Sequence, residues 1–150
     1  MSIDVTTAET GETHWVVADR IRFHGGLAGS NLELIEVEVP PGSGTPPHSH
    51  ASPEHFYVID GEITIRHFSA GRPPTTVAAR AGTSVRVASH APHNYVNESG
   101  RPARMLVLLE PSMTAFFRDI GTEEPQAAPD FARIGAAMQR HGIHALDMVP

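Results

Sequence analysis

The sequence contains no cysteine. This absence excludes disulfide bridges, thiolate metal sites and cysteine nucleophiles, and it leaves histidine and carboxylate side chains as the available metal ligands. Basic residues are few, 11 against 17 acidic residues, and they form no run that could follow a phosphate backbone. We therefore expect no nucleic acid among the partners of this chain.

Long apolar runs are also missing. No stretch approaches the roughly 18 apolar residues of a membrane-spanning helix, and the polar start MSIDVTTAETGETH lacks the basic and apolar regions of a signal peptide. We expect no membrane partner and a cytoplasmic location. A length of 150 residues is typical of one domain, so residues 1–150 are predicted to form one unit. No nucleotide, flavin or pyridoxal phosphate motif is present.

Histidine, in contrast, is abundant, with 10 residues. His48, His50 and Glu54 lie between Gly42 and Gly61 in the spacing G-x5-H-x-H-x3-E-x6-G. Residues two apart on a strand point to the same side, and Glu54 keeps this parity if the strand continues. Two imidazoles and a carboxylate suit one divalent Fe, Mn, Ni, Co or Zn ion, because nitrogen ligands disfavour Mg and Ca.

A fourth ligand is expected from a second motif. Gly82, His93 and Asn97 follow the spacing G-x10-H-x3-N. The joint occurrence of both spacings, more than any single histidine, predicts a metal site that contains His93.

These two motifs resemble those of the cupins. The first motif is matched at every signature position, whereas the second lacks the proline expected at Ala88 and the glycine expected at His90. The segments WVVADRIRF and PSMTAFFRDIG also resemble small single-domain, quercetin-dioxygenase-like cupins. The resemblance covers about residues 15–142 and implies that the four ligand-type residues named above hold the metal.

The predicted fold is all-β. Runs of alternating apolar residues predict roughly nine short strands, separated by Gly, Pro, Asn and Ser. Asp60-Gly61 between two of these runs predicts a hairpin. Many short strands favour a closed or double-sheet fold. The cupin resemblance implies a double-stranded β-helix, or jelly-roll, barrel over about residues 14–111.

Beyond Pro111 the spacing of apolar residues changes from the alternation of strands to the three- and four-residue spacing of helices. Two short helices are predicted within residues 112–142, the first capped by Ser112 and stopped by Gly121, the second capped by Asp130. Their apolar stripes comprise Met113, Phe116, Phe117 and Ile120, then Phe131, Ile134, Met138 and His141. We expect both helices to pack on the outside of the barrel or on a partner chain.

Side chains that share the parity of the ligands are predicted to line a substrate cavity. Phe56, Val58 and Tyr95 meet this condition, and Met105 lies on the last strand. Ordinary core packing is the alternative interpretation. His90, in the turn before the last ligand, is a further candidate for substrate contact or an exposed turn residue. Quercetinase-like cupins carry aromatic residues two positions after the glutamate and two after the last histidine, which supports a cavity role here.

Such a site leaves coordination positions open, which predicts a metal-dependent enzyme with a small-molecule substrate. The first interpretation is a dioxygenase of an enolisable or phenolic, flavonol-like molecule, with Glu54 accepting the hydroxyl proton. The second is a non-redox cyclase or isomerase of an aromatic polyketide-like substrate, with zinc as Lewis acid. The third is a small-ligand-binding cupin. The cupin resemblance and the surplus apolar surface also predict a homodimer.

Overall fold

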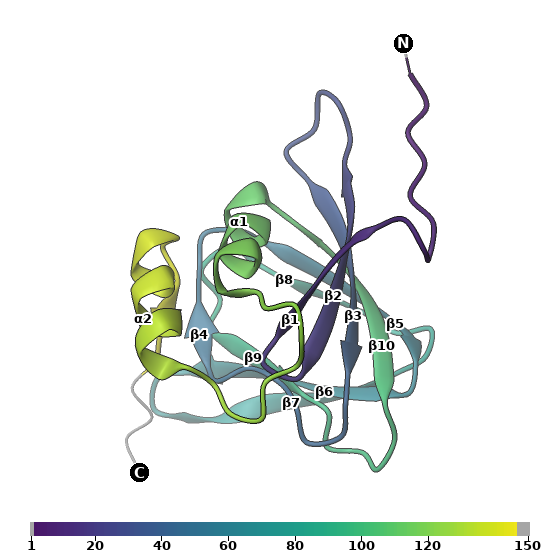
Figure 1. The fold of residues 1–150 in the computed structure, drawn as a ribbon. Coiled ribbons are helices and arrows are strands. Elements are labelled where there is room, and N and C mark those ends of the chain that lie inside the picture. Colours follow the sequence, from purple (N-terminus) through teal and green to yellow (C-terminus); the bar gives the residue numbers. More distant parts are fainter. Residues whose placement is uncertain (1, 147–150) are drawn as a thin grey trace.

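The computed structural model describes residues 2–146, which form two antiparallel β-sheets and two helices (Figure 1). The larger sheet has the strand order β1 (Glu12–Val16), β2 (Asp19–Gly26), β3 (Glu33–Val39), β10 (Ala103–Leu109), β5 (Glu54–Asp60) and β8 (Ser84–Val87). The smaller sheet has the order β11 (His144–Ala145), β4 (His48–Ser49), β9 (His93–Val96), β6 (Glu62–Ser69) and β7 (Arg72–Arg80). The helices are α1 (Pro111–Ile120) and α2 (Phe131–Arg140). The predicted all-β jelly roll with two short C-terminal helices is confirmed. Among the described residues, no helix is long and apolar enough to cross a membrane.

The apolar core is built from strands whose side chains alternate between two faces. On β3, Ile35, Val37 and Val39 are buried, and on β10 Met105 and Val107 are buried in the same alternating manner. Successive side chains of a strand point to opposite faces, so this pattern assigns one face of the sheet to the core. Each such side chain stabilises the fold by about 1.5–3 kcal/mol relative to an exposed position.

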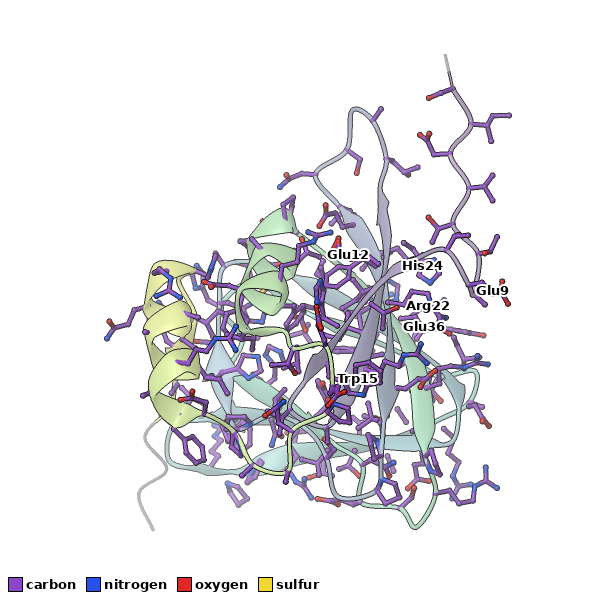
Figure 2. The ribbon with its side chains drawn as sticks, in the orientation of Figure 1. Glu9, Glu12, Trp15, Arg22, His24 and Glu36 are labelled. Carbon is purple, nitrogen blue, oxygen red and sulfur yellow. The ribbon has the colours of Figure 1, made fainter. Side chains whose placement is uncertain are left out.

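The opposite face of the larger sheet is polar. Figure 2 shows Arg22, His24 and Glu36 close together on β2 and β3. Arg22 Nη1 lies 2.8 Å and His24 Nε2 3.8 Å from Glu36 Oε2. Because these charges occupy the outer parity of their strands, the inner parity is left to the core and to the site described below.

The Asp60-Gly61 turn does not close the predicted hairpin. Strand β5 pairs with β10 and β8, whereas β6 pairs with β7 and β9, so the chain changes sheets here. Gly61 has a φ of 77°, and a Cβ at this position would lie 2.9 Å from the Cα of Ala103. The prediction was wrong because an Asp-Gly pair suits any turn that needs a positive φ, whether or not the flanking strands pair.

Several element boundaries also differ from the predictions. Strand β1 ends at Val16, because Val17 has a φ of 57° and begins the turn into β2. Strand β7 starts at Arg72, although Gly71, Pro73 and Pro74 in this stretch favour a turn. Strands β4 and β11 have two residues each, which is too short to carry a periodic pattern.

The N-cap residue is predicted correctly in one helix only, whereas the predicted stop of α1 at Gly121 is confirmed. Asp130 caps α2 and accepts a hydrogen bond from the backbone N–H of Arg133 at 3.1 Å. In α1, however, Ser112 lies inside the helix, and Glu110 is the N-cap without a side-chain hydrogen bond. Pro111 suits the first helical position because its fixed φ is helical and it has no N–H to satisfy.

Both helices pack over an opening of the barrel, and their apolar faces help to line its cavity, which corrects the prediction of an outside position (Figure 1). Met113 and Phe116 of α1 are buried there. The segment between the helices runs along the edge of β1, where Trp15 and Thr122 exchange two backbone hydrogen bonds of 2.9 Å. This connection places α2 beside α1 at the same opening.

Candidate metal centre

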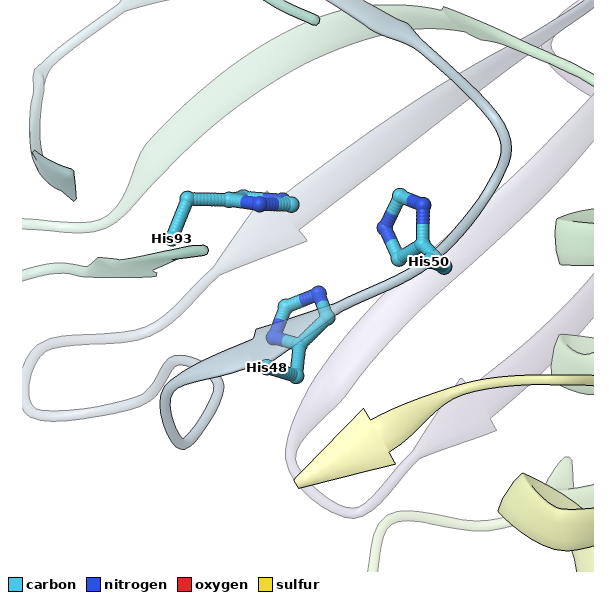
Figure 3. Close-up of side chains that lie close together, drawn as sticks. All are labelled: His48, His50 and His93. Carbon is cyan, nitrogen blue, oxygen red and sulfur yellow. The ribbon is translucent and has the colours of Figure 1, made fainter. Parts of the chain in front are cut away.

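Three histidines converge inside the barrel (Figure 3). His48 on β4 pairs directly with His93 on β9, and His50 follows two residues after His48. All three side chains are buried, and one ring nitrogen of each lies within 4.8 Å of the others. The ring centroids of His48 and His93 are 4.5 Å apart, and those of His50 and His93 are 5.2 Å apart. Three donors thus face one small space.

The backbone determines which nitrogen of each ring points into that space. The Nδ1 atoms of His48, His50 and His93 lie 2.9, 2.8 and 2.8 Å from the backbone carbonyl oxygens of Pro46, Ser52 and Ala91. A carbonyl can only accept, so each Nδ1 carries the proton and each Nε2 presents a lone pair. Such a contact fixes the ring orientation of metal-ligating histidines in general.

Glu54 supplies the carboxylate of the cluster. Its Oε1 lies 3.2 Å from His50 Nε2, and its Oε2 lies 3.4 Å from His93 Nε2. Both Nε2 atoms are buried and have no hydrogen-bond partner of good geometry. Lone pairs that face carboxylate oxygens at these distances repel each other unless a cation lies between them.

The route of the chain to Glu54 differs from the predicted one. The pairing of β4 ends at Ser49, and the chain crosses to the other sheet before β5 begins at Glu54. The continuous-strand parity used in the prediction was therefore wrong. The carboxylate still reaches the histidines because the two sheets face each other across the core.

The pKa values of these groups reflect burial and mutual contact. Burial, reinforced by the neighbouring His93, lowers the pKa of His48 to about 4. Burial alone would raise the pKa of Glu54, but the contacts and charges of His50 and His93 outweigh it and lower the pKa to about 2. Burial would likewise lower the pKa of His93, but Glu54 outweighs it and raises this pKa. At neutral pH the cluster therefore presents a carboxylate and the neutral ring of His48.

The donor set fits a divalent transition metal. Imidazole nitrogen suits Zn, Cu, Fe and Ni, and a carboxylate adds the negative charge that such ions favour. The unpartnered Nε2 atoms of His50 and His93 are the observation that argues for an ion, because buried polar atoms are otherwise satisfied. The donors present do not distinguish one late first-row metal from another.

A cavity of about 720 Å³ adjoins the cluster. His48, Glu54 and His93 form part of its wall, and the remainder is mostly apolar. Its apolar lining comes from the inner faces of β2, β3 and β10 and from both helices, and includes Ile35, Val37, Met105, Met113, Phe116 and Ile134. A volume in this range is typical of sites that bind small molecules.

Three of the five predicted cavity residues line this space and two do not. Phe56, Tyr95 and Met105 are on its wall. Val58 is fully buried in the core beyond the cavity, and His90 is exposed at the surface, so neither reaches the cavity. Strand parity identified the correct face at Val58 but could not tell how far along β5 the cavity extends.

His90 occupies the position where the second cupin motif expects glycine, and its φ of 63° explains that preference. Its N–H donates to the carbonyl of His50 at 2.8 Å, which ties the turn to the metal-site loop. Histidine is one of the few non-glycine residues enriched at such φ values. The turn is therefore formed without the signature glycine.

Two polar residues of the cavity wall, Asp19 and Ser43, were not among the predicted site residues. The carboxylate of Asp19 accepts hydrogen bonds from Ser43 Oγ and from the hydroxyl of Tyr95, both at 2.5 Å. A sequence signal existed, since Asp19, Ile21 and Phe23 are all buried and share one parity on β2. A charged residue at an inward position of an alternating strand is unusual.

The family of the chain follows from its sequence. Residues 35–109, half of the chain, match the Cupin_2 family, described as a cupin domain. The chain belongs to this family, which confirms the resemblance to cupins. Comparison with curated proteins gives no match.

Solved structures share the fold. The polyketide cyclase RemF from Streptomyces resistomycificus aligns with a TM-score of 0.61 and 23% identity, covering 73% of this chain and 80% of RemF. An RmlC-like cupin from Shewanella frigidimarina aligns with a TM-score of 0.64 and 18% identity, covering 77% and 96%. The oxalate decarboxylase of Lactobacillus farciminis aligns with a TM-score of 0.57 and 20% identity, covering 67% and 31%. These likenesses establish a shared fold, and the narrower resemblance to quercetin-dioxygenase-like cupins stays a prediction.

Proposed function

We propose that this protein is a metal-dependent enzyme acting on an enolisable or phenolic small molecule, with dioxygenation as the first candidate reaction. The observation that carries the proposal is the opening of the His48, His93 and Glu54 side chains into a largely apolar cavity. A divalent metal held by these residues would supply Lewis acidity that favours the anionic form of an enol or phenol, and a redox-active ion would also supply electron transfer with dioxygen. His50 completes the proposed ligand set.

Glu54 is the proposed proton acceptor and fourth ligand. Its pKa of about 2 keeps it ionised at neutral pH, so it can accept a proton but is a weak base. Proton transfer to Glu54 therefore requires a hydroxyl made acidic by its surroundings. Its place beside two of the ligand nitrogens puts it next to a hydroxyl bound at the same centre.

The cavity wall favours a flat, neutral substrate. Phe56 lies beside both His93 and Tyr95, and its ring centroid is 6.4 Å from that of His93 and 6.2 Å from that of Tyr95. Aromatic side chains in this arrangement offer contact area to an aromatic ring and keep water away from it. A small dianion such as a dicarboxylate would leave most of this apolar surface uncovered.

A second candidate is a non-redox cyclase or isomerase of an aromatic polyketide-like substrate. The size of the cavity, about 720 Å³, favours it, because a folded polyketide chain needs more room than one aromatic ring. The shared fold of the polyketide cyclase RemF also supports it. In this reaction the ion needs only Lewis acidity, which zinc provides.

Metal loading followed by paired assays tests the proposal. Purified protein is loaded separately with Fe, Mn, Ni, Co or Zn ions, its metal content is measured, and each form is incubated with a flavonol in air and with an aromatic polyketide chain without oxygen. Dioxygen consumption matched by oxidised product supports the first reaction, and anaerobic ring formation supports the second. His48→Ala should abolish either activity, whereas the outward-facing Tyr57→Phe should preserve it. Absence of both activities in every metal form would refute the proposal.

The predicted homodimer stays a prediction. The linker hydrogen-bonded at Trp15 covers part of the β1 edge, where a second copy could otherwise pair. Most of the helical apolar stripe now packs on its own barrel, although Phe131 is 78% exposed. Light scattering at micromolar concentration decides the question, since the monomer mass is 16.1 kDa.

A further inference from the structure

The cavity contains a second polar group besides the metal centre. Asp19, at the start of β2, is only 3% exposed. Its Oδ1 accepts a hydrogen bond from Ser43 Oγ, and its Oδ2 accepts one from the Tyr95 hydroxyl, each 2.5 Å long. All three residues line the cavity. We name this group the distal triad.

We propose that the distal triad binds a hydroxyl group at the far end of the substrate, while the metal centre holds the reacting oxygens. This inference rests on the proposed function, since it specifies the substrate of the same site. The predicted substrate is a flat, apolar molecule with an enol or phenol at one end and a free hydroxyl at the other.

The spacing of the two polar groups follows from the strands. Tyr95 is two residues after His93 on β9, so both side chains point into the cavity from positions about 7 Å apart along the strand. Phe56 lies beside both rings and joins them into one aromatic wall. A flat molecule packed on Phe56 would therefore have one end at the metal centre and the other near Tyr95.

The hydrogen bonds of the distal triad determine which group it can bind. Both donors, the hydroxyls of Ser43 and Tyr95, are already directed at Asp19. A carboxylate offers about four lone-pair positions, and a phenol oxygen keeps its own lone pairs when it donates. The triad therefore has acceptors left and no free donor. It should bind a hydroxyl and discriminate against a methoxy group, which cannot donate.

Two further observations set this group apart from ordinary core packing. Burial raises the pKa of Asp19 despite the opposing hydrogen bonds from Ser43 and Tyr95, so its carboxylate is a stronger acceptor than an exposed one. Two residues before it, Val17 has a φ of 57°, a conformation that β-branched residues rarely adopt. Backbone strain of this kind is found most often at functional sites, where the surrounding structure maintains it. A buried carboxylate is also costly beside an apolar cavity, and an apolar residue would fit the alternation of β2 better.

The experiment compares three probes that share a 3-hydroxy-4-keto end. They are 3-hydroxyflavone, 3,4′-dihydroxyflavone and 3-hydroxy-4′-methoxyflavone, which differ only at the far end of the second ring. Binding to the zinc-loaded protein is measured by calorimetry, because zinc supports no redox turnover. The dihydroxy probe should bind about tenfold more tightly than the other two, the usual effect of a hydrogen bond to a charged group.

The variants test whether the distal triad causes this preference. Asp19→Asn should reduce it to about threefold or less, because the amide keeps one acceptor oxygen but loses the charge. Tyr95→Phe removes a donor to Asp19 and leaves that carboxylate with a free oxygen, so it should keep the preference. Tyr57→Phe, which removes the other tyrosine hydroxyl on the outside of β5, should keep it. Zinc content and circular dichroism establish that each variant is folded. A purely structural role for Asp19 would alter stability but not the ratio between probes.

The outcomes separate the two proposals. Zinc-dependent binding of all three probes with equal affinity would overturn the distal triad and leave the proposed function standing. A preference retained in Asp19→Asn would also overturn the triad. Failure of every probe to bind the zinc-loaded protein would overturn both proposals.

Discussion

Replacement of Glu54 by glutamine should affect the metal-free and the metal-loaded protein in opposite directions. In the metal-free protein the Nδ1 atoms of His50 and His93 donate to backbone carbonyls, which leaves a lone pair on each Nε2. Their Nε2 lone pairs then face the Glu54 oxygens at 3.2 and 3.4 Å. A glutamine amide has the same shape and can donate one hydrogen bond to one of these nitrogens. It also removes a buried charge.

The expected magnitude follows from these contacts. One buried hydrogen bond contributes about 0.5–1.5 kcal/mol, and removal of an uncompensated buried charge adds to it. We therefore expect metal-free Glu54→Gln to be at least about 1 kcal/mol more stable than the wild type at pH 9. With metal at about 1,000 times the dissociation constant, the wild type gains about 4 kcal/mol. In Glu54→Gln the anionic ligand is lost, so the affinity for the metal should fall by about 10- to 100-fold. This loss removes about 1.4–2.7 kcal/mol of the stabilisation by metal.

The pH dependence provides an internal check. Because Glu54 raises the pKa of His93, their ion pair stabilises the metal-free wild type fully below about pH 6.5, the unfolded pKa, and this contribution is lost as the pH rises through the folded pKa. Below about pH 6.5 the protonated His93 has an anionic partner, Glu54, only in the wild type. The higher stability of metal-free Glu54→Gln relative to the wild type should therefore shrink or reverse at pH 5.

Urea unfolding followed by circular dichroism measures these free energies, with a chelator for the metal-free state and with zinc for the loaded state. Glu62→Gln is the matched control, because Glu62 pairs with the well exposed Arg80 far from the histidines. It should leave the zinc-dependent gain unchanged. If Glu54→Gln lowered stability at pH 9 without metal and left the zinc-dependent gain intact, Glu54 would not be a metal ligand.

Three further predictions concern other parts of the molecule. His90→Gly should raise the free energy of unfolding by about 0.5–1 kcal/mol, because glycine adopts the φ of 63° without strain, whereas Ser89→Gly should lower it. Phe56→Ala should weaken binding of 3-hydroxyflavone by about 1–3 kcal/mol, and an equal loss in Tyr57→Ala would show that the register of β5 is inverted. Asp119→Asn removes the carboxylate that contacts both Arg and His side chains at the end of α2, so limited proteolysis should cleave the linker between the helices faster.

The sequence predicts most of the barrel because local patterns determine it. The alternation of Ile35, Val37 and Val39 marks β3 correctly, and the change of period after Pro111 marks the helices. The positions where the chain changes sheets were not predictable in this way. The crossings at Gly61 and before Glu54 depend on which strand is the neighbour, and pairing across the fold leaves no local pattern.

The clustering of the three histidines was predictable for a different reason. Ligand-type residues such as His48 and His93 have few ordinary uses inside an apolar core, so their spacing alone indicates a site. The cavity wall could not be identified in this way. For Phe116 and Met113 the sequence cannot separate the two roles, because a cavity wall and a core need the same apolar side chains.

The same reasoning explains why Asp19 is informative. An apolar residue at an inward position cannot reveal whether it meets core or cavity, but a carboxylate there must find hydrogen bonds or lose stability. Asp19 finds two of them, from Ser43 and Tyr95, and its remaining acceptor positions have no partner among the described side chains. A charged residue at the buried parity of an alternating strand thus indicates a place where the interior is hollow. In this chain it indicates where a ligand hydroxyl would complete the hydrogen bonding.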